Sequence, residues 1–85
     1  MRLEFDPHGL EDLLFWKKTD KKKLRRIMNL LASIERTPFT GIGKPESLKY
    51  ELSGCWSRRI DYKHRLVYKV VKDTIIILSC RYHYK

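Results

Sequence analysis

The hydrophobic pattern changes its period once along the chain, and this change constrains the fold more than any other feature. Between residues 20 and 36, apolar side chains recur at helical spacing, at Leu24, Ile27, Met28, Leu31 and Ile34. After the stretch TPFTGIGKPES at residues 37–47, which is rich in Gly and Pro, apolar residues alternate with polar ones as they do in half-buried strands. The sequence therefore predicts helices followed by a sheet, which is an α+β fold.

Local signals mark where the expected elements begin and end. Residues 2–5 are expected to form a short strand, and Asp6-Pro7 supplies an N-cap and a favoured first helical residue for a helix that ends near Lys18. Thr19-Asp20 caps the second helix, which Thr37-Pro38 stops. Alternation then predicts strands over residues 48–52, 56–60, 66–70 and 74–82, so the expected order is strand, two helices and a meander of about four strands.

The size of the chain allows one domain, over residues 1–85, because 85 residues form one hydrophobic core and not two. Cys55 and Cys80 have neither a CxxC partner nor a His at ligand spacing, so we expect them to be small packing groups and expect no metal site. No cofactor motif is present. The N-terminus reaches an acid at Glu4, and the longest apolar run is IIIL, so we expect a cytoplasmic protein without a membrane segment.

The charge balance predicts a polyanionic partner. The chain has 19 Lys and Arg against 10 Asp and Glu, a net charge of +9, and nucleic acid is the commonest partner of such a surface. A membrane surface is the rival, but no apolar stripe accompanies the basic residues. The second predicted helix carries a basic face that is either simply solvated or docks on structured RNA: Lys21, Lys22, Lys23, Arg25 and Arg26.

The C-terminal half contains candidate groups for cleaving RNA without a metal, which requires a base, an acid and a cation over the phosphate. Glu46 ends the loop, Arg59 and Arg65 come from neighbouring strands, and His83 ends the last strand. His64, beside the turn, is better explained as a structural turn residue than as a second acid. Each candidate also has a purely structural explanation, so the residues alone favour a basic RNA-binding domain and leave catalysis open.

Four ordered segments resemble the YoeB (Txe) family of toxins within the RelE/ParE superfamily. They are GKPESLK, LSGCWSRRI, HRLVYKV and CRYHY, and the resemblance covers residues 37–84 closely. It implies an N-terminal strand and two helices packed on a curved antiparallel sheet, a RelE-like or microbial RNase-like fold. The RNA groove would lie on the sheet face opposite the helices.

The resemblance also implies a function: a metal-independent mRNA endoribonuclease that acts on translating ribosomes and is neutralised by a YefM-type antitoxin. Glu46 would be the general base, His83 the general acid, and Arg65 the residue that holds the scissile phosphate. The basic helix face would contact rRNA. Residues matching those that bind or orient RNA in the family are Lys49, Arg59 and Tyr84.

Other readings of the sequence stay open. A ParE-like toxin of the same fold would act on a protein target without cleaving anything, and a non-catalytic module would only bind RNA or DNA. The sequence also leaves open whether the chain forms a homodimer, which antitoxin it pairs with, which codons it prefers, and what Lys85 does beyond the usual His-Tyr ending.

Overall fold

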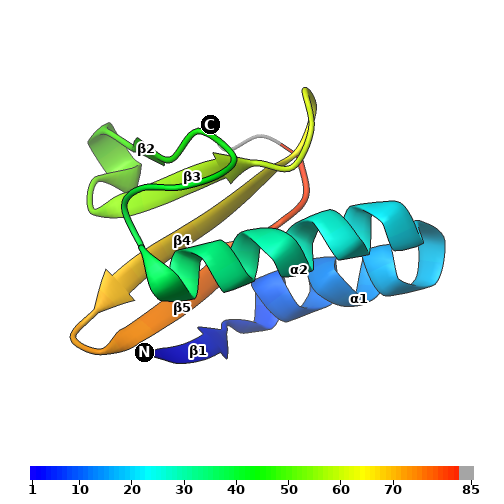
Figure 1. The fold of residues 1–85 in the computed structure, drawn as a ribbon, viewed down its shortest axis with the longest axis horizontal. Coiled ribbons are helices and arrows are strands. Elements are labelled where there is room, and N and C mark those ends of the chain that lie inside the picture. Colours follow the sequence, from blue (N-terminus) through cyan, green and yellow to red (C-terminus); the bar gives the residue numbers. More distant parts are fainter. Residues whose placement is uncertain (83–85) are drawn as a thin grey trace.

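The computed structural model describes residues 1–82, and it has the predicted α+β architecture (Figure 1). Two helices lie side by side across one face of a five-stranded sheet. Among the described residues, no helix is long and apolar enough to cross a membrane. The elements in chain order are β1 (Arg2–Phe5), α1 (Pro7–Thr19), α2 (Lys21–Arg36), β2 (Glu46–Ser47), the 3-10 helix η1 (Tyr50–Leu52), β3 (Cys55–Arg59), β4 (Arg65–Val71) and β5 (Thr74–Ser79).

The strand order is β1-β5-β4-β3-β2, and the sheet is mixed. β2 pairs antiparallel with β3, β3 with β4, and β4 with β5. β1 runs parallel to β5, with Arg2 opposite Thr74 and Phe5 opposite Ile77. The expected α+β fold is therefore confirmed, and β1 adds a parallel edge strand to the antiparallel strands β2–β5. No hairpin turn joins β1 to its partner, so nothing in the local sequence specifies its direction.

Both helices begin at the residues that the capping signals predict. The Asp6 carboxylate accepts a hydrogen bond from the Gly9 N–H at 2.7 Å, and Pro7 occupies the first turn of α1. The Asp20 carboxylate accepts from the Lys22 and Lys23 N–H groups at 3.0 and 3.2 Å. The Asp20 cap fixes the short connection between α1 and α2, which lie on the same side of the sheet.

The core lies mainly between the helices and the sheet, with a smaller cluster on the opposite face. The larger cluster joins α2 to β4 and β5, and its fully buried members include Ile27, Leu30, Ile34, Leu66, Tyr68, Ile75 and Ile77. Leu30 takes the core position that the sequence assigned to Met28, which is 51% exposed. The smaller cluster is built on Leu48, Cys55 and Val67. Both cysteines are free and buried, which confirms their packing role.

The strand expected over residues 48–52 is wrong. Pairing in β2 stops at Ser47, and Tyr50–Leu52 forms a 3-10 turn in which Tyr50 has φ 59° and is 88% exposed. Leu48 and Leu52 both pack in the smaller cluster. Two apolar residues four apart suit a helical turn as well as a strand, so the alternation did not distinguish these structures.

The last strand is shorter than predicted, because β5 ends at Ser79 rather than at residue 82. Its parallel neighbour β1 ends at Phe5, opposite Ile77, so no strand accompanies the chain further on that side. Beyond that point, side chains of α1 form hydrogen bonds with the backbone of Cys80.

Candidate functional site

Strand register places three predicted site residues on one face of the sheet. Residues directly opposite each other on antiparallel strands project to the same face. Glu46 is opposite Ser57, Ser57 is opposite Val67, and Arg59 is opposite Arg65. Val67 belongs to the smaller cluster, which lies away from the helices. Glu46, Arg59 and Arg65 therefore share the side of the sheet that the helices leave uncovered, which we call the open face.

Glu46 and Arg65 form the centre of the open face. Arg65 Nη1 lies 3.7 Å from Glu46 Oε1, and the Arg65 side chain is 14% exposed whereas that of Glu46 is 58% exposed. Arg65 Nε and Ser57 Oγ are buried and have no hydrogen-bond partner among residues 1–82. The exposed part of the Arg65 guanidinium is suited to an anionic oxygen. The site thus combines an accessible carboxylate with a cation able to hold a phosphate.

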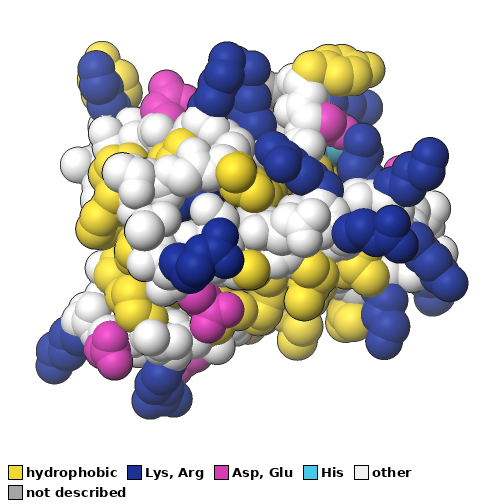
Figure 2. All heavy atoms as spheres, viewed as in Figure 1, with side chains coloured by type: hydrophobic (Ala, Val, Ile, Leu, Met, Phe, Trp, Pro, Cys, Tyr) yellow, Lys and Arg dark blue, Asp and Glu magenta, His cyan; other side chains and the backbone are white. Residues whose placement is uncertain are grey.

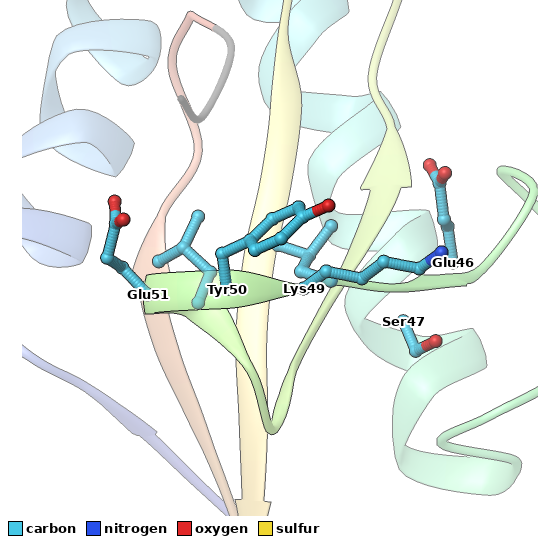
Figure 3. A pocket seen from close by; sticks show the side chains of 7 residues that line it. Glu46, Ser47, Lys49, Tyr50 and Glu51 are labelled. Carbon is cyan, nitrogen blue, oxygen red and sulfur yellow. The ribbon is translucent and has the colours of Figure 1, made fainter.

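A groove of about 420 Å³ runs from Glu46 along the following segment (Figure 3). Lys49 lines it, and its side chain extends toward the end of the groove that carries Glu46, while Glu51 stands at the other end. The exposed ring of Tyr50 also lines the groove. The groove therefore offers a cation and an aromatic surface beside the Glu46 carboxylate, as a nucleotide chain requires.

The C-terminal candidates His83 and Tyr84 lie outside the described residues, as does Lys85. The residue before them is described: the Tyr82 C=O accepts a hydrogen bond from the Arg65 N–H at 3.0 Å. The chain therefore reaches residue 82 directly beside the strand that carries Arg65.

The predicted basic face of α2 is partly engaged within the protein. Lys23 Nζ lies 2.7 Å from Asp61 Oδ2, and Arg26 Nη2 donates to the Arg59 C=O at 3.0 Å. The exposed members are Lys21, Lys22 and Arg25. Figure 2 shows Lys and Arg side chains over much of one face, with a group at the end of the molecule where α1 joins α2.

The turn between β3 and β4 is fixed by Asp61. Its Oδ1 accepts from the Lys63 and His64 N–H groups at 2.8 and 2.6 Å, which confirms His64 as a turn residue. Burial acts to raise the pKa of Asp61, but the Lys23 ammonium and these two N–H groups outweigh it and lower the pKa to about 2. The hydrogen bond to Asp61 raises the pKa of Lys23. This ion pair ties α2 to the turn next to Arg59.

Arg58 is a structural residue of the site whose partners the sequence did not reveal. It is fully buried, and its Nε donates to the Tyr68 hydroxyl at 3.2 Å. The other guanidinium N–H groups are also used. Their acceptors are Ser33 Oγ at 2.8 Å and the carbonyls of Ile42 at 3.1 Å, Thr37 at 2.7 Å and Thr40 at 2.8 Å. Arg58 therefore shapes the loop that leads into Glu46.

Gly41 allows this loop to close over the guanidinium. It has φ 121°, and a Cβ at this position would stand 2.5 Å from Ser33 Oγ and 3.0 Å from Arg58 Nη1. A side chain here would be strained and would also displace Arg58. The Gly-Pro density of residues 37–47 signalled a loop, but not the buried cation on which the loop rests.

The described residues offer neither a reactive Cys80 thiol nor a cluster of metal ligands. Burial raises the pKa of the Cys80 thiol to about 12, with the Asp12 carboxylate adding to the effect, so this thiol stays protonated near neutral pH. Among residues 1–82, no three His, Cys, Asp or Glu side chains are grouped so that they could hold a metal ion.

Comparison with known proteins matches nearly the whole chain to one family. The family described as YoeB-like toxin of bacterial type II toxin-antitoxin system matches residues 5–84. Toxin YoeB of Streptomyces coelicolor is 55% identical over 84 residues, covering 99% of this chain and 100% of that protein. Toxin YoeB of Escherichia coli K12 is 50% identical with the same coverage.

Solved structures of similar sequence have the same fold. A YoeB/ParE toxin from Agrobacterium tumefaciens superposes with a TM-score of 0.96 at 41% identity, covering 99% of this chain and 100% of that one. Two Staphylococcus aureus structures, a YoeB-YefM complex and a YoeB dimer, give TM-scores of 0.90 and 0.91 at 46% and 47% identity. Each covers 99% of this chain and 98% of the other.

Proposed function

This chain belongs to the YoeB-like toxins of bacterial type II toxin-antitoxin systems, and from this membership and its open face we propose that it is an endoribonuclease that cuts mRNA on translating ribosomes. Its effect would be to inhibit translation.

The observation that carries the proposal is the Arg65–Glu46 pair on the open face. Arg65 Nη1 stands 3.7 Å from the carboxylate, and its buried Nε has no partner among residues 1–82. A phosphate would receive hydrogen bonds from Arg65, and its ribose would then lie within reach of the exposed Glu46 carboxylate. This is the arrangement that 2′-hydroxyl attack requires, with the base on one side of the phosphorus and a cation on the phosphate oxygens.

The proposed reaction assigns one proton transfer to each of two side chains. Glu46 takes the proton of the 2′-hydroxyl, whose oxygen attacks the phosphorus, and His83 gives a proton to the leaving 5′-oxygen. The products are a 2′,3′-cyclic phosphate, or the 3′-phosphate from its hydrolysis, and a 5′-hydroxyl. Because acid, base and cation all come from side chains, the mechanism requires no metal or cofactor.

Four further groups support RNA binding around this centre in the proposal. Lys49 lies in the groove with Glu46, and the exposed Arg59 stands beside Arg65 across the strand pair. Tyr84 orients RNA from the C-terminal end. The basic face of α2, through its exposed Lys21, Lys22 and Arg25, contacts rRNA with the help of the net charge of +9.

The proposed partners follow from the relatives. A solved YoeB-YefM complex and a solved YoeB dimer, both from Staphylococcus aureus, superpose on this chain. We propose that a YefM-type antitoxin neutralises this chain by covering the open face, that the chain can pair with a second copy, and that it acts in the cytoplasm, where translating ribosomes are found.

Mapping of RNA 5′ ends in a translating extract tests the proposal. We expect new 5′-hydroxyl ends within coding sequence when the protein is added, and none when a YefM-type antitoxin is added with it. Arrest of translation without new ends would contradict the proposal and favour a toxin that acts on a protein target. Binding of RNA without arrest or cleavage would favour a non-catalytic module.

A further inference from the structure

Side chains, rather than a neighbouring strand, hold the segment that follows β5. The Cys80 N–H donates to Asp12 Oδ2 at 3.0 Å, and the Cys80 C=O accepts from Trp16 Nε1 at 2.7 Å. All of these groups are buried. Two residues of α1, one turn apart, thus replace the pairing that β1 no longer provides, and they fix the direction in which the chain leaves the sheet.

The next fixed point is Tyr82, which is held through both of its backbone groups. Its N–H donates to His64 Nδ1 at 2.7 Å, and its C=O accepts from the Arg65 N–H at 3.0 Å. Tyr82 has φ 62°, a left-handed conformation that is unfavourable for a residue with a side chain. The bonds to His64 and Arg65 offset this cost, so the backbone of Tyr82 depends on them.

The His64 imidazole is itself held in place. His64 is only 8% exposed, and its ring packs edge-on against the Trp16 ring, with the two centroids 4.8 Å apart. Its backbone N–H donates to Asp61 Oδ1. Because Nδ1 accepts the Tyr82 N–H, it carries a lone pair, and the ring is neutral with its proton on Nε2. A protonated imidazole has N–H groups on both nitrogens and cannot accept this bond.

We propose that His64 is a positioning residue for RNA cleavage: its neutral ring holds the backbone immediately before His83, and protonation of the ring releases that backbone. The inference rests on the proposed function, in which His83 is the general acid. His64 acts through Tyr82 and touches neither the substrate nor the reacting atoms.

The surroundings of His64, burial first among them, favour the neutral, accepting form at neutral pH. The ring faces a pocket with titratable or charged side chains from three elements: Asp20 and Lys23 at the α1–α2 connection, Asp61 and Lys63 in the turn, and Arg81 and Tyr82 in the C-terminal segment. Burial lowers the pKa of His64 from 6.5, and Lys63, Lys23 and Arg81 lower it further against the opposing effect of Asp61. The accepting form is therefore complete above pH 6.5 and is lost as pH falls through the lowered pKa.

Two substitutions separate the hydrogen bond of His64 from its packing. His64→Phe keeps a ring against Trp16 but has no acceptor, whereas His64→Asn places an amide oxygen where Nδ1 stands and does not titrate. The measurement is the single-turnover cleavage rate on programmed ribosomes, at saturating protein, between about pH 5 and 8.

We expect His64→Phe to cut roughly 10- to 100-fold more slowly than the unsubstituted protein at neutral pH, since a small displacement of a catalytic group is enough to cause this. His64→Asn should keep most of the rate at neutral pH, and its rate relative to that of the unsubstituted protein should rise on acidification. Amide exchange of the Tyr82 N–H, measured by NMR, should be fast in His64→Phe and slow in His64→Asn.

Each failure has its own signature. An unsubstituted protein that cuts, together with a His64→Phe variant that cuts equally fast, overturns the role of His64 and leaves the proposed function standing. An unsubstituted protein that never cuts overturns the proposed function itself. If His64→Phe does not fold, His64→Asn decides: a rate relative to the unsubstituted protein that does not rise on acidification overturns the inference.

Discussion

Two neighbouring arginines of β3 have opposite roles because a strand sends successive side chains to opposite faces. Arg58 points toward the helices, where carbonyls and hydroxyls take all of its N–H groups, while Arg59 is exposed on the open face. The alternation of Trp56, Arg58 and Ile60 with Ser57 and Arg59 predicted these faces from sequence. It could not predict the partners of Arg58, because they come from a loop and a helix distant in the chain.

Replacing Arg58 should destabilise the whole domain. Arg58→Met removes the donors and leaves buried carbonyls and hydroxyls without partners, so we expect the free energy of unfolding to fall by about 3–5 kcal/mol. Arg59→Met is the matched control and should change it by less than about 0.5 kcal/mol. Urea unfolding followed by circular dichroism measures both. Equal losses for the two variants would contradict the structural role of Arg58.

Replacing the proposed acid and the phosphate-binding cation should abolish activity without loss of folding. We expect His83→Ala to reduce the cleavage rate about 10²- to 10⁴-fold and Arg65→Ala about 10²- to 10³-fold. Both variants should still bind the antitoxin. Growth inhibition on induction, together with co-purification of the antitoxin, provides the measurement. A His83→Ala protein that cuts mRNA at the full rate would refute its assignment as the acid.

The Cys80 thiol should be inert in the folded protein. With its pKa raised to about 12, its thiolate fraction at pH 8 is roughly 10³-fold below that of an ordinary cysteine. Alkylation by iodoacetamide, followed by peptide mass spectrometry, should label Cys80 only after unfolding in urea. Labelling of the native protein at the unfolded rate would show that α1 does not cover this residue.

At the level of elements, the helix caps were the most predictable features. Asp6 and Asp20 cap their helices through local hydrogen bonds, which sequence signals describe well. The parallel direction of β1 and the early end of β5 were not predictable, because both depend on contacts between opposite ends of the chain. Trp16 and Asp12 of α1 reach Cys80, and no local pattern reports such a contact.

The turn between β3 and β4 should lose stability in acid. Asp61 has a pKa near 2 against an ordinary 3.8, so its contribution is complete well above pH 3.8 and is lost as pH falls through about 2. We expect Asp61→Asn to lower the free energy of unfolding at pH 7 by about 1–2 kcal/mol. Urea unfolding at pH 7 and at pH 3 measures this free energy for both proteins, and the difference between Asp61→Asn and the unsubstituted protein should be smaller at pH 3. A difference that does not change with pH would mean that the ion pair with Lys23 contributes nothing.

At the scale of the whole molecule, the helices cover one face of the sheet and leave the other for chemistry. Sequence supplied Glu46, Arg59 and Arg65 as candidates, and the register of β2, β3 and β4 brings them to the same face. Lys49 joins them from the segment after β2, in the groove that begins at Glu46. His83 and Tyr84 lie beyond the described residues, so their arrival at this face stays a prediction.

The central claim is that the open face activates a ribose 2′-hydroxyl, and a single substitution in the RNA tests it most directly. The measurement compares cleavage at one mapped site in a translated mRNA that carries either ribose or 2′-deoxyribose at the nucleotide on the 5′ side of the cut. We predict full cleavage of the ribose form and none of the deoxy form at that site. Cleavage of both forms at equal rates would contradict the mechanism.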